Sequence, residues 1–387
     1  MMKRTRYIPL DRPHAEYLEV AVNALQHVRY RVRELLLDRT GMEQASFTSP
    51  DGQQKVMLQV DKEAENACAR FLVGHLGDEQ IRVLGEETLW KFKELDLNTH
   101  HLVGYGDRVK LVAGPESRIT AITDMIDGSD LVERDFGNWC SAMIFFRPRP
   151  SPGILFSLIH HEDGTIYGAD EMGSFLIPAG SAKGSPLVSL RGPEPRNLNQ
   201  SAAYKKPREE TAQIAICYYG QKASHFLTLP SELLTWAKRS PSRSRVRFYN
   251  FCGNPMMARL ANGENVHAVF EHVGQFPHDA APGAFIGLQA GAHLMSLSGK
   301  NINADDLAQS LMTPSGAALQ YVLASTKEIA FELARALGSG RVFYACPYSC
   351  GSPGKIDLRS SNPPICDTCH KPMIAHDRRA EALVVGL

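Results

Sequence analysis

The sequence predicts a layered α/β protein that ends in a small, separately stabilised tail. Segments with the short apolar runs of strands alternate with segments whose apolar residues recur at helical spacing, which favours sheets covered by helices. The chain has 387 residues, more than one hydrophobic core usually holds. Two closely spaced cysteine pairs follow near its end. We therefore expect an N-terminal α+β unit over residues 1–150, a second α/β unit over 151–340 and a tail over 341–387.

The charge balance indicates a small-molecule partner. Lysine plus arginine number 42, as do aspartate plus glutamate, so no overall charge attracts nucleic acid or an anionic membrane. The basic N-terminus is not followed by an apolar run, and no stretch approaches the length that spans a bilayer. We expect a cytoplasmic protein that binds neither nucleic acid nor membrane.

The first half of the chain is expected to fold as helix, strand, helix and two further strands. In order these are a long amphipathic helix from a cap at Asp11 to Leu35, a strand at 55–60, a helix opened by Asp61, and strands at 81–84 and 118–123. Each of the last two strands leads into an acidic cluster, at Gly85 and at Asp124. Residues 88–117 show weak periodicity, and we assign no element to them.

The second half is expected to begin with buried strands and to continue with alternating helices and strands. The predicted elements are adjacent strands at 140–146 and 153–160, a hairpin strand at 165–167, an exposed loop over 180–210, a strand at 213–218, a helix at 254–260, a strand at 267–270, a helix that begins after Asp279, and a helix at 316–337.

Three acidic clusters carry the chemistry of this sequence. Their residues are Gly85-Glu86-Glu87, Asp124-Met125-Ile126-Asp127-Gly128-Ser129 and His278-Asp279-Ala280-Ala281. Each cluster alone is more often a solvated turn. Together they offer several carboxylates, the oxygen ligands that hard cations such as Mg²⁺ require. The combination predicts metal-assisted hydrolysis of a phosphate ester.

With Asp61 upstream, the order and spacing of these clusters resemble the inositol monophosphatase superfamily of lithium-sensitive phosphatases, over about residues 15–340. The family's middle motif reads Asp-Pro-Ile/Leu-Asp-Gly-Thr, and its last motif reads Trp-Asp-x-Ala. This chain keeps the carboxylates and differs at Met125, Ser129 and His278, which changes loop rigidity and the pocket wall. The resemblance implies a layered αβαβα sandwich of the inositol monophosphatase and fructose-1,6-bisphosphatase type, and a homodimer.

The resemblance also implies a site for two or three Mg²⁺ ions. Its ligands would be the side chains of Glu86, Asp124, Asp127 and Asp279 and the carbonyl oxygen of Ile126. Asp124 would bridge two ions. Glu87 would either support these ligands or reach a further, weakly held ion, and the sequence leaves both roles open.

Catalysis would then use Glu86, Ser129 and Asp61. Glu86 would orient the attacking water, whose proton would pass through Ser129 Oγ to Asp61, as in the family's Thr and Asp pair. Gly128 leaves room for the phosphate, which the amides of Gly128 and Ser129 would bind from the start of a helix. Taken alone, Asp61 is more often a helix cap; the family context favours the catalytic role.

Two further residues match the family's contacts with the leaving group. Asn254 lies in the stretch that corresponds to the family's Gly-x-Ala segment, and Glu271 precedes Asp279 by eight residues. Both would hydrogen-bond a polyol or ribose, although Glu271 at a strand end suits a structural role nearly as well. Relatives handle inositol phosphates, sugar bisphosphates and 3′-phosphorylated adenosine nucleotides, and the choice among these substrates stays open.

The C-terminal tail resembles a zinc ribbon. Its thiol pairs are Cys346 with Cys350 and Cys366 with Cys369, on segments rich in turn-forming residues. Tetrahedral Zn²⁺ takes four thiolates, so we expect a structural zinc that is closed to substrate. His370 is a competing ligand, and a reduced tail without metal is the alternative.

We therefore expect a Mg²⁺-dependent phosphomonoesterase that acts on a small phosphorylated polyol, sugar or nucleotide. The alternative is a non-catalytic binding protein, in which the phosphatase fold is a scaffold and the zinc-ribbon tail contacts a protein partner. Nucleic-acid binding by the tail is disfavoured because few cations flank its thiols. Loss of the predicted carboxylates would have favoured the alternative, and all of them are present.

Overall fold

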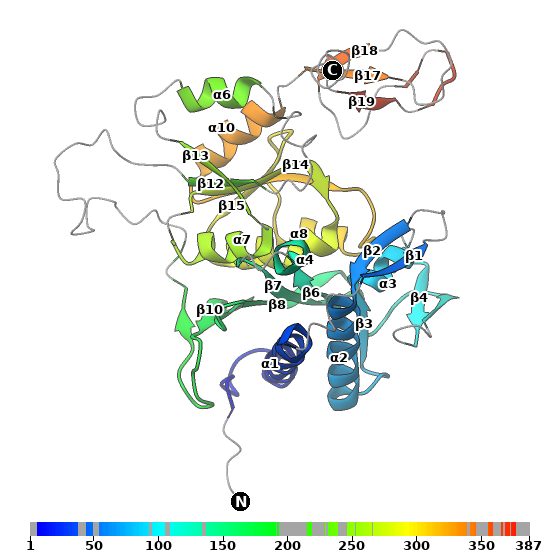
Figure 1. Ribbon diagram of the computed structural model, residues 1–387, viewed down its shortest axis with the longest axis vertical. Helices are drawn as coiled ribbons and strands as arrows, with labels where there is room; N and C mark the ends of the chain where they lie inside the picture. Colours follow the sequence, from blue (N-terminus) through cyan, green and yellow to red (C-terminus); the bar gives the residue numbers. More distant parts are fainter. Residues whose placement is uncertain are drawn as a thin grey trace, which may run out of the picture.

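The computed structural model describes residues 6–37, 44–48, 54–92, 95–104, 109–133, 137–190, 192, 215–218, 229, 231–238, 246–251, 253–264, 266–338, 341–345, 355–358, 365–366, 368–371 and 373–376. In these residues helices and sheets alternate in five layers (Figure 1). The fold is the αβαβα sandwich that the sequence resemblance implied. Among the described helices, none combines the length and the apolar character that crossing a membrane requires.

Seven strands form the first sheet, in the order β11-β10-β9-β8-β7-β6-β3. Their bounds are β3 Ile81–Gly85, β6 Ile119–Asp127, β7 Cys140–Arg147, β8 Gly153–His161, β9 Ile166–Asp170, β10 Gly173–Ile177 and β11 Val188–Ser189. β3 and β6 are parallel, and the other neighbours are antiparallel. The central strands are buried on both faces, as their apolar runs predict. The expected domain boundary at residue 150 falls inside this sheet, between β7 and β8.

Helices α1 (Ala15–Leu37) and α2 (Gln59–Leu76) cover the outer face of this sheet (Figure 1). Their apolar faces pack into one core with β3, β6, β7 and β8. The predicted cap at Asp11 is wrong: α1 begins at Ala15, after His14, whose φ of 54° lies in the left-handed region. α2 begins two residues before Asp61, because the preceding strand β2 (Gln54–Leu58) is shorter than predicted.

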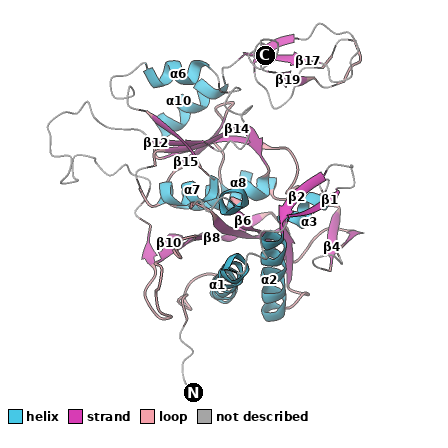
Figure 2. Ribbon diagram, viewed as in Figure 1, coloured by secondary structure: helices cyan, strands magenta, loops and turns pink. Residues whose placement is uncertain are grey.

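Five strands form the second sheet, in the order β13-β12-β14-β16-β15. Their bounds are β12 Ala215–Tyr218, β13 Arg247–Asn250, β14 Ala268–Gln275, β15 His293–Ser296 and β16 Leu319–Ala324. Helices α7 (Gly253–Ala261) and α8 (Pro277–Gln289) lie between the two sheets, as Figure 2 shows. Their residues share one core with β7, β8 and β14, so this helix layer joins the two sheets. The short helix α9 (Ala304–Ser310) contributes to the same core.

The single helix predicted over 316–337 is wrong. The segment forms strand β16 in the second sheet, paired with β14 and β15, and then helix α10 (Lys327–Gly338). Thr326 separates them, since its Oγ1 accepts a hydrogen bond from Ile329 N at 3.2 Å and caps the helix. Helices α10 and α6 (Ser231–Lys238) pack on the outer face of this sheet in a third core.

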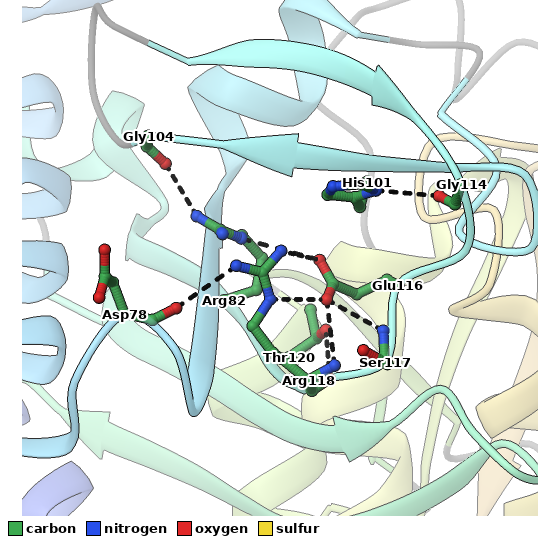
Figure 3. A network of polar contacts seen from close by, with 9 residues as sticks. All are labelled: Asp78, Arg82, His101, Gly104, Gly114, Glu116, Ser117, Arg118 and Thr120. Atoms are coloured by element: carbon green, nitrogen blue, oxygen red, sulfur yellow. Dashed lines mark hydrogen bonds and ion pairs between the residues drawn. The ribbon is translucent and has the colours of Figure 1, made fainter.

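Residues 88–117, left unassigned from sequence, contain helix α3 (Glu86–Lys91) and a hairpin of β4 (His100–Val103) and β5 (Lys110–Ala113). Buried charges join this hairpin to β3 (Figure 3). Arg82 on β3 donates to Gly104 O at 3.0 Å and lies 3.7 Å from Glu116, which Arg118 Nε contacts at 2.8 Å. We call Arg82, Glu116 and Arg118 the arginine–glutamate cluster.

The tail has a three-stranded antiparallel sheet in the order β18-β17-β19. The strands are β17 Arg341–Ala345, β18 Lys355–Leu358 and β19 Ile374–His376, and they lie apart from the five layers (Figure 1).

The strand β1 (Gln44–Thr48) pairs with β2, and the helix α4 (Ser129–Glu133) follows β6. Most of the predicted loop over 180–210 lies outside the described residues.

Candidate functional site

Two predicted metal ligands lie at the carboxyl end of β6. The pairing of β6 with β7 is irregular between Asp124 and Asp127, and this irregularity reshapes the end of the strand. Ile126 N donates to Asp124 Oδ1 at 3.1 Å, and Ser141 Oγ on β7 donates to Met125 O at 2.7 Å. These bonds fix both the strand end and the carboxylate of Asp124.

The carboxylate of Asp124 is buried among other acids. Its pKa is raised well above the ordinary value, first by burial and then by neighbouring negative charge. The residues that supply this charge, in decreasing order of effect, are Glu86, Asp127, Asp279 and Asp61. The fold therefore gathers five carboxylates from widely separated segments of the chain. All five were predicted to belong to the site.

Asp127 lies beside the amino end of α7. Burial raises the pKa of its carboxyl to about 7, hydrogen bonds from the side chain and the backbone amide of Asn254 lower it, and the charge of Asp279 raises it. Cys140 Sγ is 3.9 Å from Asp127 Oδ2. Asp127 on the first sheet thus contacts a helix that belongs to the middle layer.

Asp279 is in the first turn of α8 and its side chain is 23% exposed. His278 Nε2 lies 3.0 Å from Asp279 Oδ1, and His278 Nδ1 lies 2.7 Å from the carbonyl oxygen of Pro314. Burial disfavours the charged imidazole, but the Asp279 carboxylate outweighs this and raises the pKa of His278. The contact of His278 with Asp279 was not predicted; the position of His278 directly before Asp279 in a helical first turn is the signal for it.

Asp61 caps a helix and lies near the other acids, and its catalytic role stays a prediction. Its Oδ2 accepts a hydrogen bond from Leu58 N at 3.1 Å, which caps the first turn of α2. Its charge also acts on Asp124. Glu86 is the first residue of α3, directly after β3, as its position at a strand end predicts. The side chain of Glu87 lies outside the part of the chain that the structure describes.

Gly128 and Ser129 connect β6 to α4. Gly128 has a φ of 98°, a conformation that favours glycine, and its carbonyl accepts from Leu131 N and Val132 N. Helix α4 therefore begins at Ser129, where the resemblance placed a helix start. Ser129 is partly exposed at this position.

The two predicted substrate contacts are enclosed by protein. Asn254 is fully buried; its Nδ2 donates to Asp279 O and its Oδ1 accepts from Gly283 N, both at 2.8 Å. Glu271 is 2% exposed, and its Oε1 accepts from Val273 N and Gly274 N where β14 is irregular. Burial raises the pKa of Glu271 to about 7. A substrate hydroxyl would have to displace these bonds to reach either side chain.

The chemistry of this donor set fits a hard divalent cation. Carboxylate oxygens are the ligands of Mg²⁺, and five acids gathered around the buried pair Asp124 and Asp127 repel one another unless cations or protons neutralise them. Among the described residues, however, no group of three or more His, Cys, Asp or Glu side chains is preformed to hold a metal ion. The argument for a divalent cation therefore rests on the carboxylate side chains and their closeness to Asp124, and not on a preformed ligand geometry.

The second thiol pair of the tail lies on a tight turn. His370 N donates to Cys366 O and Cys366 N donates to Lys371 O, both at 2.9 Å, and His370 has a φ of 56°. Cys366 is buried and Cys369 partly so. The predicted ligands Cys346 and Cys350 lie outside the described residues.

Solved structures of known proteins share this architecture. The extragenic suppressor protein SuhB of Bartonella henselae aligns with a TM-score of 0.54 at 16% identity, over 84% of this chain and 99% of its own. The fold is that of inositol monophosphatases. An inositol monophosphatase (IMPase) of Thermotoga maritima aligns with a TM-score of 0.52 at 14% identity, over 83% and 96% of the two chains. An IMPase/NADP phosphatase in complex with NADP and Ca²⁺ aligns with a TM-score of 0.51 at 14% identity, over 82% and 93%.

The inositol monophosphatase fold is established here by structure alone. No protein-family model and no curated protein sequence matches the chain. At 14–16% identity the likeness to these structures identifies the fold, and the activity has to be argued from the residues of this chain.

Proposed function

We propose that this chain is a Mg²⁺-dependent phosphomonoesterase of the inositol monophosphatase superfamily, acting on a small phosphorylated polyol, sugar or nucleotide. The observation that carries the proposal is the burial of Asp124 among four other carboxylates. Like charges gathered around a buried carboxylate cost stability, and groups perturbed in this way cluster at functional sites. The shared fold supports the family assignment.

The residues proposed to hold the ions are Glu86, Asp124, Asp127 and Asp279, with the carbonyl of Ile126. The negative charges of the other acids all act on Asp124. In addition, a solved structure of the same fold, an IMPase/NADP phosphatase, is described in complex with Ca²⁺. A divalent cation there would supply positive charge to the phosphate ester and lower the pKa of the attacking water. Two or three ions remain part of the proposal.

The chain's own groups would bind the phosphate and accept the proton. Gly128 presents no side chain to the phosphate, and the first amides of a helix have no acceptor within it, so those of Gly128 and Ser129 suit an anion. Ser129 Oγ would relay a proton to Asp61. The bond from Leu58 N holds Asp61 in place for this role.

The test is a panel of phosphate esters assayed for phosphate release with and without Mg²⁺. Inositol phosphates, sugar bisphosphates and 3′-phosphorylated nucleotides should include a substrate whose hydrolysis requires Mg²⁺ and is lost in Asp124→Asn. Asp163→Asn is the matched control, because Asp163 is an exposed turn residue whose side chain caps Thr165 N. Mg²⁺-independent turnover, or full activity of Asp124→Asn, would refute the proposal.

A second candidate is the non-catalytic binding protein. It is favoured by one observation, the lack of a preformed ligand set among the described acids. Calorimetry separates the two candidates, because a phosphatase of this kind must take up Mg²⁺ and a scaffold need not.

For the tail, we keep structural zinc as part of the proposal. The hydrogen-bonded turn at Cys366 and Cys369 and the small three-stranded sheet support it, since tight turns present paired thiolates to zinc. Freshly purified protein should contain stoichiometric zinc by elemental analysis. Zinc-free protein with an intact tail would reject this part alone.

A further inference from the structure

We propose that Asn254 is a positioning residue that ties Asp127 on the first sheet to the first turn of α8, and so sets Asp127 and Asp279 relative to each other. The inference rests on the proposed function, because it concerns the same acids. It gives Asn254 a role other than substrate contact.

The amide of Asn254 joins α7 to α8 at the residue that carries the carboxylate. Its Nδ2 donates to Asp279 O and its Oδ1 accepts from Gly283 N, each at 2.8 Å. Asp279 C=O and Gly283 N–H are four residues apart, the pair that bonds to each other in a regular α-helix. One side-chain amide therefore bonds to both partners of a helical hydrogen bond.

The sequence of α8 explains why a side chain can enter its ladder there. Pro282 lies inside this helix and has no N–H, so the helical bonding is already interrupted beside Gly283. A Cβ at position 283 would come within 2.8 Å of Asn254 Oδ1 and 2.9 Å of Met257 Cβ. Glycine is thus what allows α7 to approach α8 this closely.

The same residue also contacts the first sheet. Its side chain and backbone amide also lie close enough to the Asp127 carboxylate to lower the pKa of that group. Asn254 is in the first turn of α7 and is followed by Pro255, which that position tolerates. Asn254 is fully buried and all these bonds are to protein groups, so it is placed to fix the acids and not to meet a substrate.

An asparagine suits this position because its amide both donates twice and accepts. Alanine would leave Gly283 N–H and Asp279 C=O without this partner, and Asp127 would keep only the backbone amide of residue 254. Groups that support ligands from behind typically change metal affinity or activity 10–100-fold when removed. We therefore expect Asn254→Ala to weaken Mg²⁺ binding about tenfold or more.

The experiment measures Mg²⁺ binding by calorimetry and thermal unfolding in EDTA, for the unaltered protein, Asn254→Ala, Asn254→Ser and Asn262→Ala. Asn262 is the matched control: it directly follows the same helix, is also buried, and donates to Glu264 at 2.7 Å. The expected result is weaker Mg²⁺ binding in Asn254→Ala, partial recovery in Asn254→Ser, and unchanged affinity in Asn262→Ala.

Each other outcome decides against the inference. Equal Mg²⁺ affinity in folded Asn254→Ala, with only a lower unfolding temperature, makes the residue structural. If Asn254→Ala does not fold, the Mg²⁺ affinity of Asn254→Ser is compared with that of the unaltered protein instead, and equal affinity again makes the residue structural. If neither variant folds, the residue is also structural. If the unaltered protein takes up no Mg²⁺, the proposed function itself fails, which is a distinguishable result.

Discussion

Strands β3 and β6 run parallel, and buried charge lies at both of their ends. At the starting end the arginine–glutamate cluster pairs opposite charges: Glu116 is 1% exposed, yet its pKa is lowered, because its bonds to Arg118 and the charge of Arg82 outweigh the cost of burial. At the finishing end Asp124 is also buried, and its pKa is raised by other acids. In the cluster opposite charges attract, and removing one of them would destabilise the fold; the like charges around Asp124 repel one another, and a bound cation would relieve that repulsion.

The largest expected effect is the loss of activity in Asp124→Asn, at the carboxyl ends of β3 and β6. Asp124→Asn should reduce Mg²⁺-dependent phosphate release by on the order of 10³-fold, the scale of losing a group that stabilises transition-state charge. In EDTA the same variant should be more stable than the unaltered protein by about 1 kcal/mol, because the amide removes like-charge repulsion. Urea unfolding in EDTA measures this. A less stable variant would show that the acids do not repel, and would end the comparison.

The opposite end should respond in the opposite sense. Glu116→Gln leaves Arg82 and Arg118 without their carboxylate, and removing one partner of a buried pair typically costs about 3 kcal/mol or more. Arg82 is the more buried of the two, at 6% side-chain exposure, so most of the loss should come from it. Mg²⁺ affinity of the folded variant should be unchanged in calorimetry. A large change in that affinity would mean that the two ends are coupled along the strands.

The sequence predicts which acids lie close together, but it does not predict the hydrogen bonds that position them. The strand end places Glu86 correctly, because β3 stops at Gly85, whereas β6 continues past the predicted end at residue 123 to Asp127, so that Asp124 lies within the strand and not after it. The bonds of Asn254 depend on how closely α7 packs on α8, and a local pattern carries no such information. Glu271 illustrates the same limit, since its partners are amides of its own irregular strand.

The mistaken helix over 316–337 has a similar cause. Its apolar spacing fits helix and buried strand equally well, and the strand is decided by pairing with β14 and β15. Thr326 is a local cap signal that would have divided the segment. The homodimer, the cytoplasmic location and the zinc stay predictions.

The last expected effect is a pH dependence that the acidic end should produce. The pKa of Asp127 is raised to about 7 and that of Asp124 is raised well above its ordinary value, so in EDTA the folded protein keeps protons that the unfolded chain releases. Stability should therefore fall as the pH rises from about 4 to 7, by at most about 1.4 kcal/mol per pH unit for each such group.

Urea unfolding at several pH values in EDTA tests this slope. Glu271 titrates in the same window, with a pKa of about 7, so Glu271→Gln is needed to subtract its part. Glu116, whose pKa is lowered, has the opposite sign: its contribution is present above its unfolded pKa and is lost only in more acidic solution. Saturating Mg²⁺ should flatten or reverse the slope between pH 5 and about 7, because the cation favours the ionised acids. A slope that Mg²⁺ leaves unchanged would mean that the protons and the cation do not compete for these carboxylates.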